Sequence, residues 1–322
     1  MTGEQTSLVS SQPSISVIVP VYNEAPNLRE LYNRLKKALD DYGKSYELLF
    51  IEDGSTDESF SILKELHNLD SRIRAVRFAR NFGQQVAIAA GLRHARGNVV
   101  VLIDADLQTM PEEIPKLVEK ISEGYDIVYG IRQRRKDPFL RRVGSWCMSH
   151  LLYRVTNIEI PDSASGFLAL NRNFVDSINL FNEKSKYFSG LFAWLSYGRW
   201  ASVPVEHAPR HAGVSKYSIP KLVGLALDFV FSFTTLPLRF ASYAGFVFSL
   251  IGIVALCWVV LLRLIGYFTH LPQGTLLLSV LLLCSGIQLL SVGILGEYLA
   301  KVYIEVKERP SYVIKEVLDN TQ

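Results

Sequence analysis

Short apolar runs alternate with amphipathic segments through the first third of the 322-residue chain. Each amphipathic segment repeats its apolar residues at helical spacing, and each apolar run is short enough for one strand. Strands that alternate with helices of about 10–15 residues are typical of βαβ units in a mainly parallel sheet. The sequence therefore predicts an α/β domain with strands at residues 16–21, 47–51, 73–78 and 99–103 and helices at residues 27–42, 59–69 and 84–95.

Acidic and glycine-containing clusters follow three of these strands, at residues 20–24, 52–57 and 104–108. In open parallel sheets, ligands collect outside the carboxyl ends of the strands, so we expect the three clusters to converge there. No Gly-x-Gly-x-x-Gly follows the first strand, and no Gly-x-x-x-x-Gly-Lys-Ser/Thr phosphate loop occurs. A dinucleotide-dependent dehydrogenase and a P-loop enzyme are therefore disfavoured.

Asp104 and Asp106 flank a small residue directly after an apolar strand. Two carboxylates at this spacing suit Mg²⁺ or Mn²⁺, which prefer hard oxygen ligands from carboxylates and diphosphates. A bare Asp-x-Asp is more often a solvated turn, so its place at a strand end gives this motif its weight. The sequence thus predicts a divalent metal site here.

Asp53 follows the second strand, where its carboxylate can accept hydrogen bonds from a base or a ribose. Its alternative role is to cap the next helix, which Asp57 or Ser59 can do instead. Tyr22 and Glu24 offer a stacking face and an acceptor for a nucleotide, although a plain turn between strand and helix explains this segment as well. These residues predict a nucleotide pocket.

Two apolar segments near the C-terminal end are long enough for membrane helices. Residues 241–262 carry no charge, and the next uncharged run covers residues 264–296. A spanning helix needs about 20 mostly apolar residues. We expect spans at 241–262 and 274–296, preceded by an amphipathic segment at 218–239 that lies in the membrane interface. Helices buried in a soluble core are the alternative for both features.

Lysines and arginines flank the outer ends of this hairpin, whereas its connecting turn holds only Arg263. The positive-inside bias then places both termini in the cytoplasm. The polar N-terminal residues do not resemble a cleaved secretory signal, and three scattered cysteines fit neither a disulfide framework nor a zinc site. The expected organisation is a disordered segment at 1–14, the α/β domain at 15–217, the amphipathic segment at 218–239, two membrane helices within 240–297 and a cytoplasmic tail at 298–322.

The overall charge is nearly balanced, with 34 Lys and Arg against 31 Asp and Glu. A nucleic-acid partner is therefore disfavoured, because such proteins show a basic surface and a high pI. One basic run stands out at residues 132–136. It is either a solvated face or a contact for anionic lipid headgroups or an acceptor phosphate.

Four ordered motifs resemble those of one known family. They are VIVPVYNE at 17–24, EDGSTD at 52–57, RNFGQ at 80–84 and DADLQ at 104–108. Together they resemble the family-2 glycosyltransferases with the GT-A fold, and more narrowly the polyprenyl-phosphate glycosyltransferases, such as bactoprenol glucosyltransferases and dolichol-phosphate mannose synthases. The later stretches at 208–217 and 236–239, followed by two apolar segments, are similar to the membrane-anchored bacterial members.

The resemblance covers nearly the whole chain and implies an enzyme that transfers a single sugar with inversion. The expected donor is a nucleotide sugar, UDP-glucose first, and the expected acceptor is an undecaprenyl-type polyprenyl phosphate. The resemblance also implies Mg²⁺ or Mn²⁺ as cofactor, the lipid bilayer as a partner, a bacterial inner-membrane location and, as in some relatives, a homo-oligomer.

The same resemblance assigns roles to matching positions. It places Asp104, Asp106 and Asp162 in the catalytic set and gives the metal to Asp106 and Gln108. The acceptor phosphate falls to Arg199, Arg210 and Lys216. The residues that it implies for the nucleotide sugar are Pro20, Tyr22, Glu24, Asp53, Asp104 and Arg132.

One segment departs from the family pattern. Many bacterial relatives carry Asp-x-Gly-Asp-Phe-Arg where this chain has DSASGFL at residues 162–168. The second acid and the arginine are missing, so Asp162 either carries the remaining function or caps a turn. The difference is compatible with another sugar or another acceptor geometry.

Two other functions are weighed against this one. A processive polysaccharide synthase needs Gln-x-x-Arg-Trp and a multi-helix channel, whereas Ser196 stands at the glutamine position and only two spans follow. A catalytically idle scaffold or binding subunit of a membrane glycolipid system is the alternative from another class. The altered 162–168 segment keeps it open, and the intact Asp104, Asp106 and Gln108 argue against it.

Overall fold

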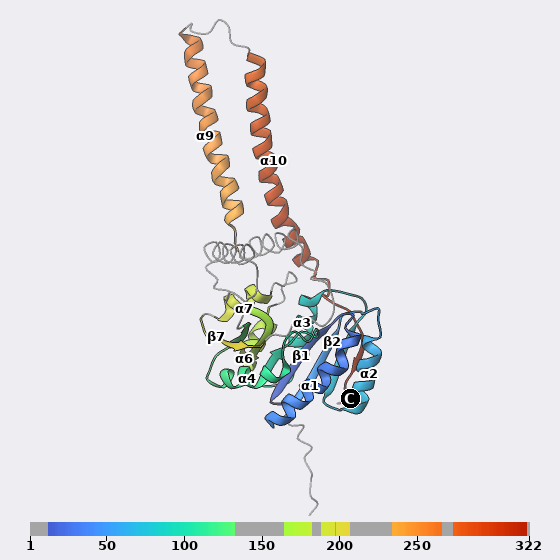
Figure 1. Cartoon of the computed structure of the whole chain (residues 1–322). Coiled ribbons are helices and arrows are strands. Elements are labelled where there is room, and N and C mark those ends of the chain that lie inside the picture. The colour runs from blue at the N-terminus through green and yellow to red at the C-terminus, as the bar shows by residue number, and fades with distance from the viewer. Residues whose placement is uncertain are drawn as a thin grey trace, which may run out of the picture. The chain divides into compact units, whose positions relative to one another are not determined.

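The computed structural model describes residues 12–132, 164–181, 188–196, 198–206, 234–265 and 273–320. The chain divides into two compact units. One unit is built around a β-sheet, and the other contains two long helices (Figure 1).

One mixed sheet forms the centre of the first unit. Its strands are β1 (Ile15–Val21), β2 (Tyr46–Glu52), β3 (Ile73–Phe78), β4 (Val99–Leu102), β5 (Ile127–Arg132), β6 (Ala164–Asn171), β7 (Trp200–Val205) and β8 (Ile314–Leu318), in the order β7-β5-β6-β4-β1-β2-β3-β8. Neighbours among β3, β2, β1 and β4 are parallel, as are β5 and β7, whereas β6 and β8 run antiparallel to their neighbours. The predicted α/β class is confirmed, and each of the four predicted strands ends within one residue of the observed bounds.

Helices cover both faces of the sheet. They are α1 (Ala25–Tyr42), α2 (Ser59–Leu69), α3 (Gln84–His94), the short 3₁₀ helix η1 (Pro111–Glu113), α4 (Ile114–Ser122), α6 (Arg172–Asn179) and α7 (Phe188–Ser196). Buried residues of α1, α2 and α4 share one apolar cluster, and those of α3, α6 and α7 share the cluster on the other face. The three predicted helices are confirmed, with α1 beginning two residues earlier than expected.

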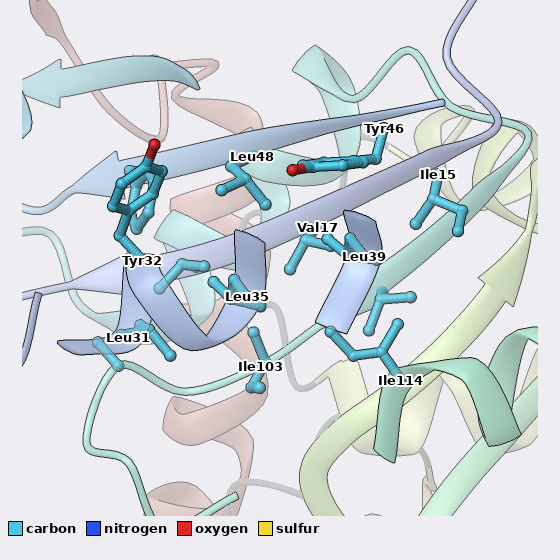
Figure 2. Packing of buried hydrophobic residues seen from close by; sticks show 14 of the residues in the cluster. Ile15, Val17, Leu31, Tyr32, Leu35, Leu39, Tyr46, Leu48, Ile103 and Ile114 are labelled. Atoms are coloured by element: carbon cyan, nitrogen blue, oxygen red, sulfur yellow. The ribbon is translucent and has the colours of Figure 1, made fainter. Parts of the chain in front are cut away.

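Figure 2 shows how α1 closes over β1 and β2. Leu31, Leu35 and Leu39 recur at helical spacing and point at strand residues that include Val17 and Leu48. All five are at most 1% exposed. Burial of one such side chain contributes about 1.5–3 kcal/mol, so the packing of this face holds α1 on β1 and β2.

The strand order reverses beside β1. The chain passes from β1 through β2 to β3 and then returns to β4 on the other side of β1. Pairing between β1 and β4 ends at Ile18 and Leu102, and Pro20 has no N–H with which to continue it. Open α/β sheets bind their ligands at such a reversal, outside the carboxyl ends of the strands. The residues after β1 and β4 therefore flank the expected ligand position.

Strand β8 belongs to the segment predicted as a cytoplasmic tail at 298–322. It pairs antiparallel with β3 and covers an edge that would otherwise expose unpaired backbone groups. The Ala79 N–H donates to the Val313 carbonyl at 2.8 Å, and Tyr312 stacks on Phe78 with ring centroids 4.8 Å apart. The last part of the described chain is thus integral to the sheet.

A network of buried ion pairs lies at the amino end of the parallel strands. Arg74 Nη1 donates to Glu47 Oε2 at 2.7 Å, and Arg74 Nε donates to Asp319 Oδ2 at 3.0 Å. Arg96 Nη2 donates to the same Asp319 oxygen at 2.8 Å. The side chains of Arg74, Glu47 and Asp319 are at most 10% exposed. The network joins the residue after β8 to the starts of β2, β3 and β4.

Residues 12–14 were expected within a disordered segment but are hydrogen-bonded to this end of the sheet. Gln12 Nε2 donates to the Arg96 carbonyl at 2.7 Å, and the Ser14 N–H donates to the Ser45 carbonyl at 3.0 Å. Residues 1–11 lie outside the described part of the chain.

The second unit contains α9 (Leu236–Leu264) and α10 (Gln273–Val306). Both are long and apolar enough to cross a membrane, with mean hydropathies of 1.5 over Leu236–Val254 and 1.4 over Leu283–Val306. They include the predicted spans 241–262 and 274–296 and extend beyond them. The predicted amphipathic segment falls mostly on residues that are not described, and its last residues form the first turn of α9.

Candidate functional site

The loops that follow β1 and β2 are joined by hydrogen bonds. The Asn23 N–H donates to Ser55 Oγ at 3.0 Å, and the Thr56 N–H donates to Asn23 Oδ1 at 2.9 Å. The Glu24 N–H donates to Ser59 Oγ at 3.1 Å. Asn23 has a φ of 55°, in the left-handed region that asparagine tolerates better than most residues. Two of the three predicted clusters therefore form one connected surface.

Three predicted nucleotide-binding residues lie on this surface. Tyr22 is 36% exposed, so its ring is accessible for stacking. Pro20 and Glu24 are half-buried, and the Glu24 carboxylate accepts a hydrogen bond from Asn27 Nδ2 at 2.7 Å. Their positions agree with the predicted pocket, whose ligand contacts stay a prediction.

Asp53 is only 2% exposed. Its Oδ1 accepts the Phe82 N–H at 2.6 Å, and its Oδ2 accepts the Gly83 N–H at 2.8 Å. Burial raises the pKa of the Asp53 carboxyl, and the two backbone donors offset part of that rise. Asp57 accepts the Ser59 N–H at 3.0 Å at the start of α2, which leaves Asp53 outside that role. Asp53 therefore fastens the end of β2 to the segment before α3, a contact that the sequence did not predict.

Gly54 brings the loops after β2 and β3 into direct contact. Its φ is 66°, and a Cβ at this position would lie 2.3 Å from the Arg80 carbonyl carbon and 2.6 Å from the Asn81 nitrogen. Only glycine allows this approach. The RNFGQ motif at 80–84 is thereby held against the predicted nucleotide loops.

The predicted metal-binding side chains follow β4. Asp104, Asp106 and Gln108 are half-buried, and the residues between them are buried. Asp106 Oδ1 accepts the Gln108 N–H at 3.1 Å. Leu107 has a φ of 58°, which is unusual for a bulky residue and is held in place by its burial. The backbone is thus bent tightly where two of the predicted ligands stand.

Two residues without a predicted role lie against the Asp104 carboxylate. Gln84 Nε2 donates to Asp104 Oδ1 at 2.8 Å. Gly166 lies opposite Asp104 because Leu102 pairs with Leu168 in the antiparallel β4–β6 ladder. A Cβ at Gly166 would lie 2.8 Å from Asp104 Oδ2. Both stand in segments that the sequence analysis singled out, RNFGQ and DSASGFL, but a single sequence does not show which carboxylate they approach.

The backbone of Arg132 ends β5 at the carboxyl end of the sheet, paired with Val205. The strand packs tightly on β6, because a Cβ at Gly130 would lie 2.6 Å from Phe167 Cδ1. The position of Arg132 on the carboxyl end of the sheet agrees with its predicted role near the donor phosphates, which stays a prediction.

The prediction that Arg199 binds the acceptor phosphate is not supported by its position. Arg199 precedes β7 at the amino end of the sheet, where Nη2 donates to the Gly124 carbonyl at 3.0 Å and Nε lies 3.4 Å from Asp126 Oδ2. About five strand residues, roughly 16 Å, separate this level from that of Asp104. The role of Arg199 at the acceptor phosphate stays a prediction. Asp162, Arg210 and Lys216 lie outside the described residues.

The donor atoms near β4 suit a divalent cation that is shared with a phosphate ligand. Asp106 and Gln108 offer a carboxylate and an amide oxygen, which are hard ligands for Mg²⁺ or Mn²⁺. Among the described residues, no three or more His, Cys, Asp or Glu side chains gather to enclose an ion by themselves. Mg²⁺ is commonly held by one or two carboxylates together with substrate phosphates, so this donor set fits such an ion.

Comparisons with known proteins agree with this architecture. Residues 16–178 match the model of the family described as Glycosyl transferase family 2. The uncharacterized glycosyltransferase YkcC of Bacillus subtilis (strain 168) is 39% identical over 301 residues, which cover 93% of each chain. The uncharacterized glycosyltransferase sll0501 of Synechocystis is 37% identical over 304 residues, which cover 94% of this chain and 95% of the relative.

Solved structures with a similar fold include glucosyl-3-phosphoglycerate synthase from Mycobacterium tuberculosis in complex with Mn²⁺, UDP and phosphoglyceric acid. It is 22% identical, with a TM-score of 0.48, over 68% of this chain and 76% of that one. TarS of S. aureus in complex with UDP-GlcNAc is 17% identical, with a TM-score of 0.46, over 68% of this chain and 66% of that one.

Proposed function

Because the chain belongs to glycosyl transferase family 2, we propose that it transfers one sugar from a nucleotide-sugar donor to a polyprenyl phosphate. UDP-glucose is the first donor to test. One observation carries the proposal: the acid-bearing loops after β1, β2 and β4 are tied together where the strand order reverses. The GT-A fold thus supports a nucleotide-sugar site at the carboxyl end of the sheet.

In the proposed donor complex, the nucleotide lies on the loops after β1 and β2. Tyr22 stacks on the base, and Glu24 and Pro20 line the same pocket. Asp53 is proposed to line this pocket as well; it is buried, and its two backbone hydrogen bonds fasten the loop before α3 beside the nucleotide. Arg132 completes the donor contacts at the phosphates. The proposal follows from the shared surface that these loops form.

Asp106 and Gln108 are proposed to hold Mg²⁺ or Mn²⁺, and Asp104 faces the donor. When bound, the ion stabilises the negative charge that develops on the leaving nucleoside diphosphate. Without the ion, the carboxylates of Asp104 and Asp106 would repel the diphosphate, so Asp106 and Gln108 would act on it through the ion that they hold. Their half-buried positions reduce competition from water for these contacts.

The acceptor requires little activation in this mechanism. A prenyl phosphate is an anion at neutral pH, so one of its oxygens attacks the anomeric carbon directly if cationic side chains hold it in line. Arg210 and Lys216 are proposed for that task, and Asp162 for a supporting one. A single direct displacement inverts the anomeric configuration, so no carboxylate nucleophile of the glycosidase type is needed.

A lipid acceptor is supported by α9 and α10, because no part of the apolar stretch in either helix is buried inside the structure. Because β8 belongs to the sheet of the first unit, the chain returns to that unit after α10. Two spans return a chain to the side on which it started, in agreement with the positive-inside bias. We infer an inner-membrane protein whose catalytic domain and termini are cytoplasmic.

The test is a transfer assay with the full-length protein in membranes. Polyprenyl phosphate is incubated with a panel of UDP- and GDP-sugars, and the lipid product is weighed by mass spectrometry, with Mg²⁺ or Mn²⁺ and then with a chelator. We expect one hexose per lipid, formed fastest from UDP-glucose and abolished by chelation. Transfer that survives chelation contradicts the metal assignment, and donor turnover without any lipid product contradicts the acceptor.

A further inference from the structure

The Asp104 carboxylate has a defined neighbour on each of its oxygens. On one side, Gln84 Nε2 donates to Oδ1 at 2.8 Å. On the other side, Oδ2 lies over Gly166, where a Cβ would come within 2.8 Å. A carboxylate rotates about a broad, twofold torsion, so without such neighbours its orientation is weakly determined. The hydrogen bond from Gln84 favours one orientation, and the absence of a Cβ at Gly166 leaves room for it.

Gln84 is itself placed by the loop that precedes it. Asp53 binds the N–H groups of Phe82 and Gly83 at 2.6 and 2.8 Å, directly before Gln84 begins α3. Gly54 packs on the backbone of Arg80 in the same loop. The side chain of Gln84 is exposed, so its amide is not held by burial. The side chain that contacts Asp104 therefore comes from a backbone that is held by the residues after β2.

We propose that Gln84 is a positioning residue, whose amide orients Asp104 for sugar transfer and couples it to the Asp53-bound loop beside the nucleotide pocket. The inference rests on the proposed function. A neutral amide donor suits this task, because it fixes the direction of a carboxylate and adds no charge that would compete for the metal or the diphosphate. An arginine or lysine at the same place would add that charge.

The experiment compares Gln84→Met with Gln84→Lys in the full-length protein. Methionine has nearly the same length as glutamine and no N–H, so it removes the donor and keeps the shape. Lysine is long enough to restore a donor to Asp104. Gln12→Met is the matched control, because it removes an amide hydrogen bond of 2.7 Å at the other end of the sheet. The readouts are kcat, the KM for donor and acceptor, UDP affinity by calorimetry, and the unfolding temperature in chelator.

We expect Gln84→Met to lower kcat about 10- to 100-fold, as loss of one hydrogen bond to an ionised group predicts. The acceptor KM and the metal-free unfolding temperature should match those of the wild type, Gln84→Lys should recover part of the loss, and Gln12→Met should behave as wild type. Full kcat in Gln84→Met overturns the inference, as does a loss of kcat that tracks the unfolding temperature.

The two proposals fail differently. A wild-type protein that binds no nucleoside diphosphate and turns over no nucleotide sugar refutes the proposed function and this inference with it. A wild-type protein that transfers sugar while Gln84→Met keeps its kcat refutes only the role of Gln84.

Discussion

Two acidic side chains at each end of the sheet are held in different ways. At the carboxyl end, Asp53 and Asp104 accept hydrogen bonds from backbone and amide N–H groups. At the amino end, Glu47 and Asp319 are paired with the guanidinium groups of Arg74 and Arg96. A neutral N–H directs a carboxylate and leaves its charge in place, whereas a guanidinium directs it and cancels the charge.

This difference in hydrogen-bond donors corresponds to different roles for the two ends of the sheet. Arginine pairs at the amino end bind elements that are far apart in the sequence, including the residue after β8, and their contribution is to stability. The N–H donors at the carboxyl end leave the negative charge of the carboxylates in place. Such contacts therefore suit side chains whose charge is used in binding. Substitutions at the two ends should therefore separate activity from stability.

The largest effect is expected for Asp106→Asn at the carboxyl end. Asparagine keeps an oxygen for the Gln108 N–H but removes the charge that a divalent ion requires. Transfer should fall at least about 10³-fold, equivalent to about 4 kcal/mol, with an unchanged free energy of unfolding. Initial rates with Mn²⁺ and UDP-glucose, together with thermal unfolding, measure both. If the variant keeps more than a tenth of wild-type transfer, the charge of Asp106 is not needed for activity and the assigned role of the carboxyl end is wrong.

At the amino end, Arg74→Met should act on stability. It leaves the buried carboxylates of Glu47 and Asp319 without one partner, which typically costs about 3–5 kcal/mol. The kcat of the protein that remains folded should be unchanged. Urea unfolding provides the measurement, and Arg29→Met is the control, because Arg29 and its partner Glu65 are both more than half exposed and their pair should be worth less than about 1 kcal/mol. Equal costs for the two variants would refute the assignment.

Gly166→Ala should have a smaller effect, and on activity. The added methyl group reaches within 2.8 Å of Asp104 Oδ2, so the carboxylate must turn away. We expect kcat to fall about 10- to 100-fold with a loss of stability below about 1 kcal/mol, since the site is exposed. Gly252→Ala, where a Cβ meets nothing within 4 Å, is the control. Wild-type kcat in Gly166→Ala would show that the orientation of Asp104 is unimportant.

The smallest effect concerns pH. Arg72 lowers the pKa of Asp70 from 3.8 to about 2. A depressed pKa in the folded state means that the pair stabilises the protein above pH 3.8 and that this contribution is lost as the pH falls through about 2. Asp70→Asn should therefore cost about 2 kcal/mol at pH 7 and almost nothing near pH 2, with kcat unaffected. Unfolding curves across this range check it, and a pH-independent cost would contradict the ion-pair origin.

The sequence predicted the parts of the fold that depend on local pattern. The apolar strands and amphipathic helices up to residue 103 were predicted because the pattern of each one lies within a short stretch of sequence. Strand β8 was missed because it forms by pairing with β3, more than 200 residues earlier, and its short sequence resembles a tail. The amphipathic segment and the acceptor loop fall outside the described residues, so those predictions stand as they were.

At the site, the sequence predicted which acids follow the strands but not what orients them. Asp53, Asp104 and Asp106 could be placed at strand ends because the apolar runs that precede them predict where the strands end. The contacts of Gln84 and Gly166 depend on the packing of α3 and the register of β6, which no local pattern encodes. Arg199 was assigned from the family resemblance, and the structure places it before β7, at the amino end of the sheet.

The position of β8 has a consequence for how this protein is made. Among the described strands it is synthesised last, after both long apolar helices. Until then β3 is an open edge, and Arg74 lacks its aspartate partner. The complete sheet therefore forms only after both helices have been synthesised, because its edge strand follows them in the chain.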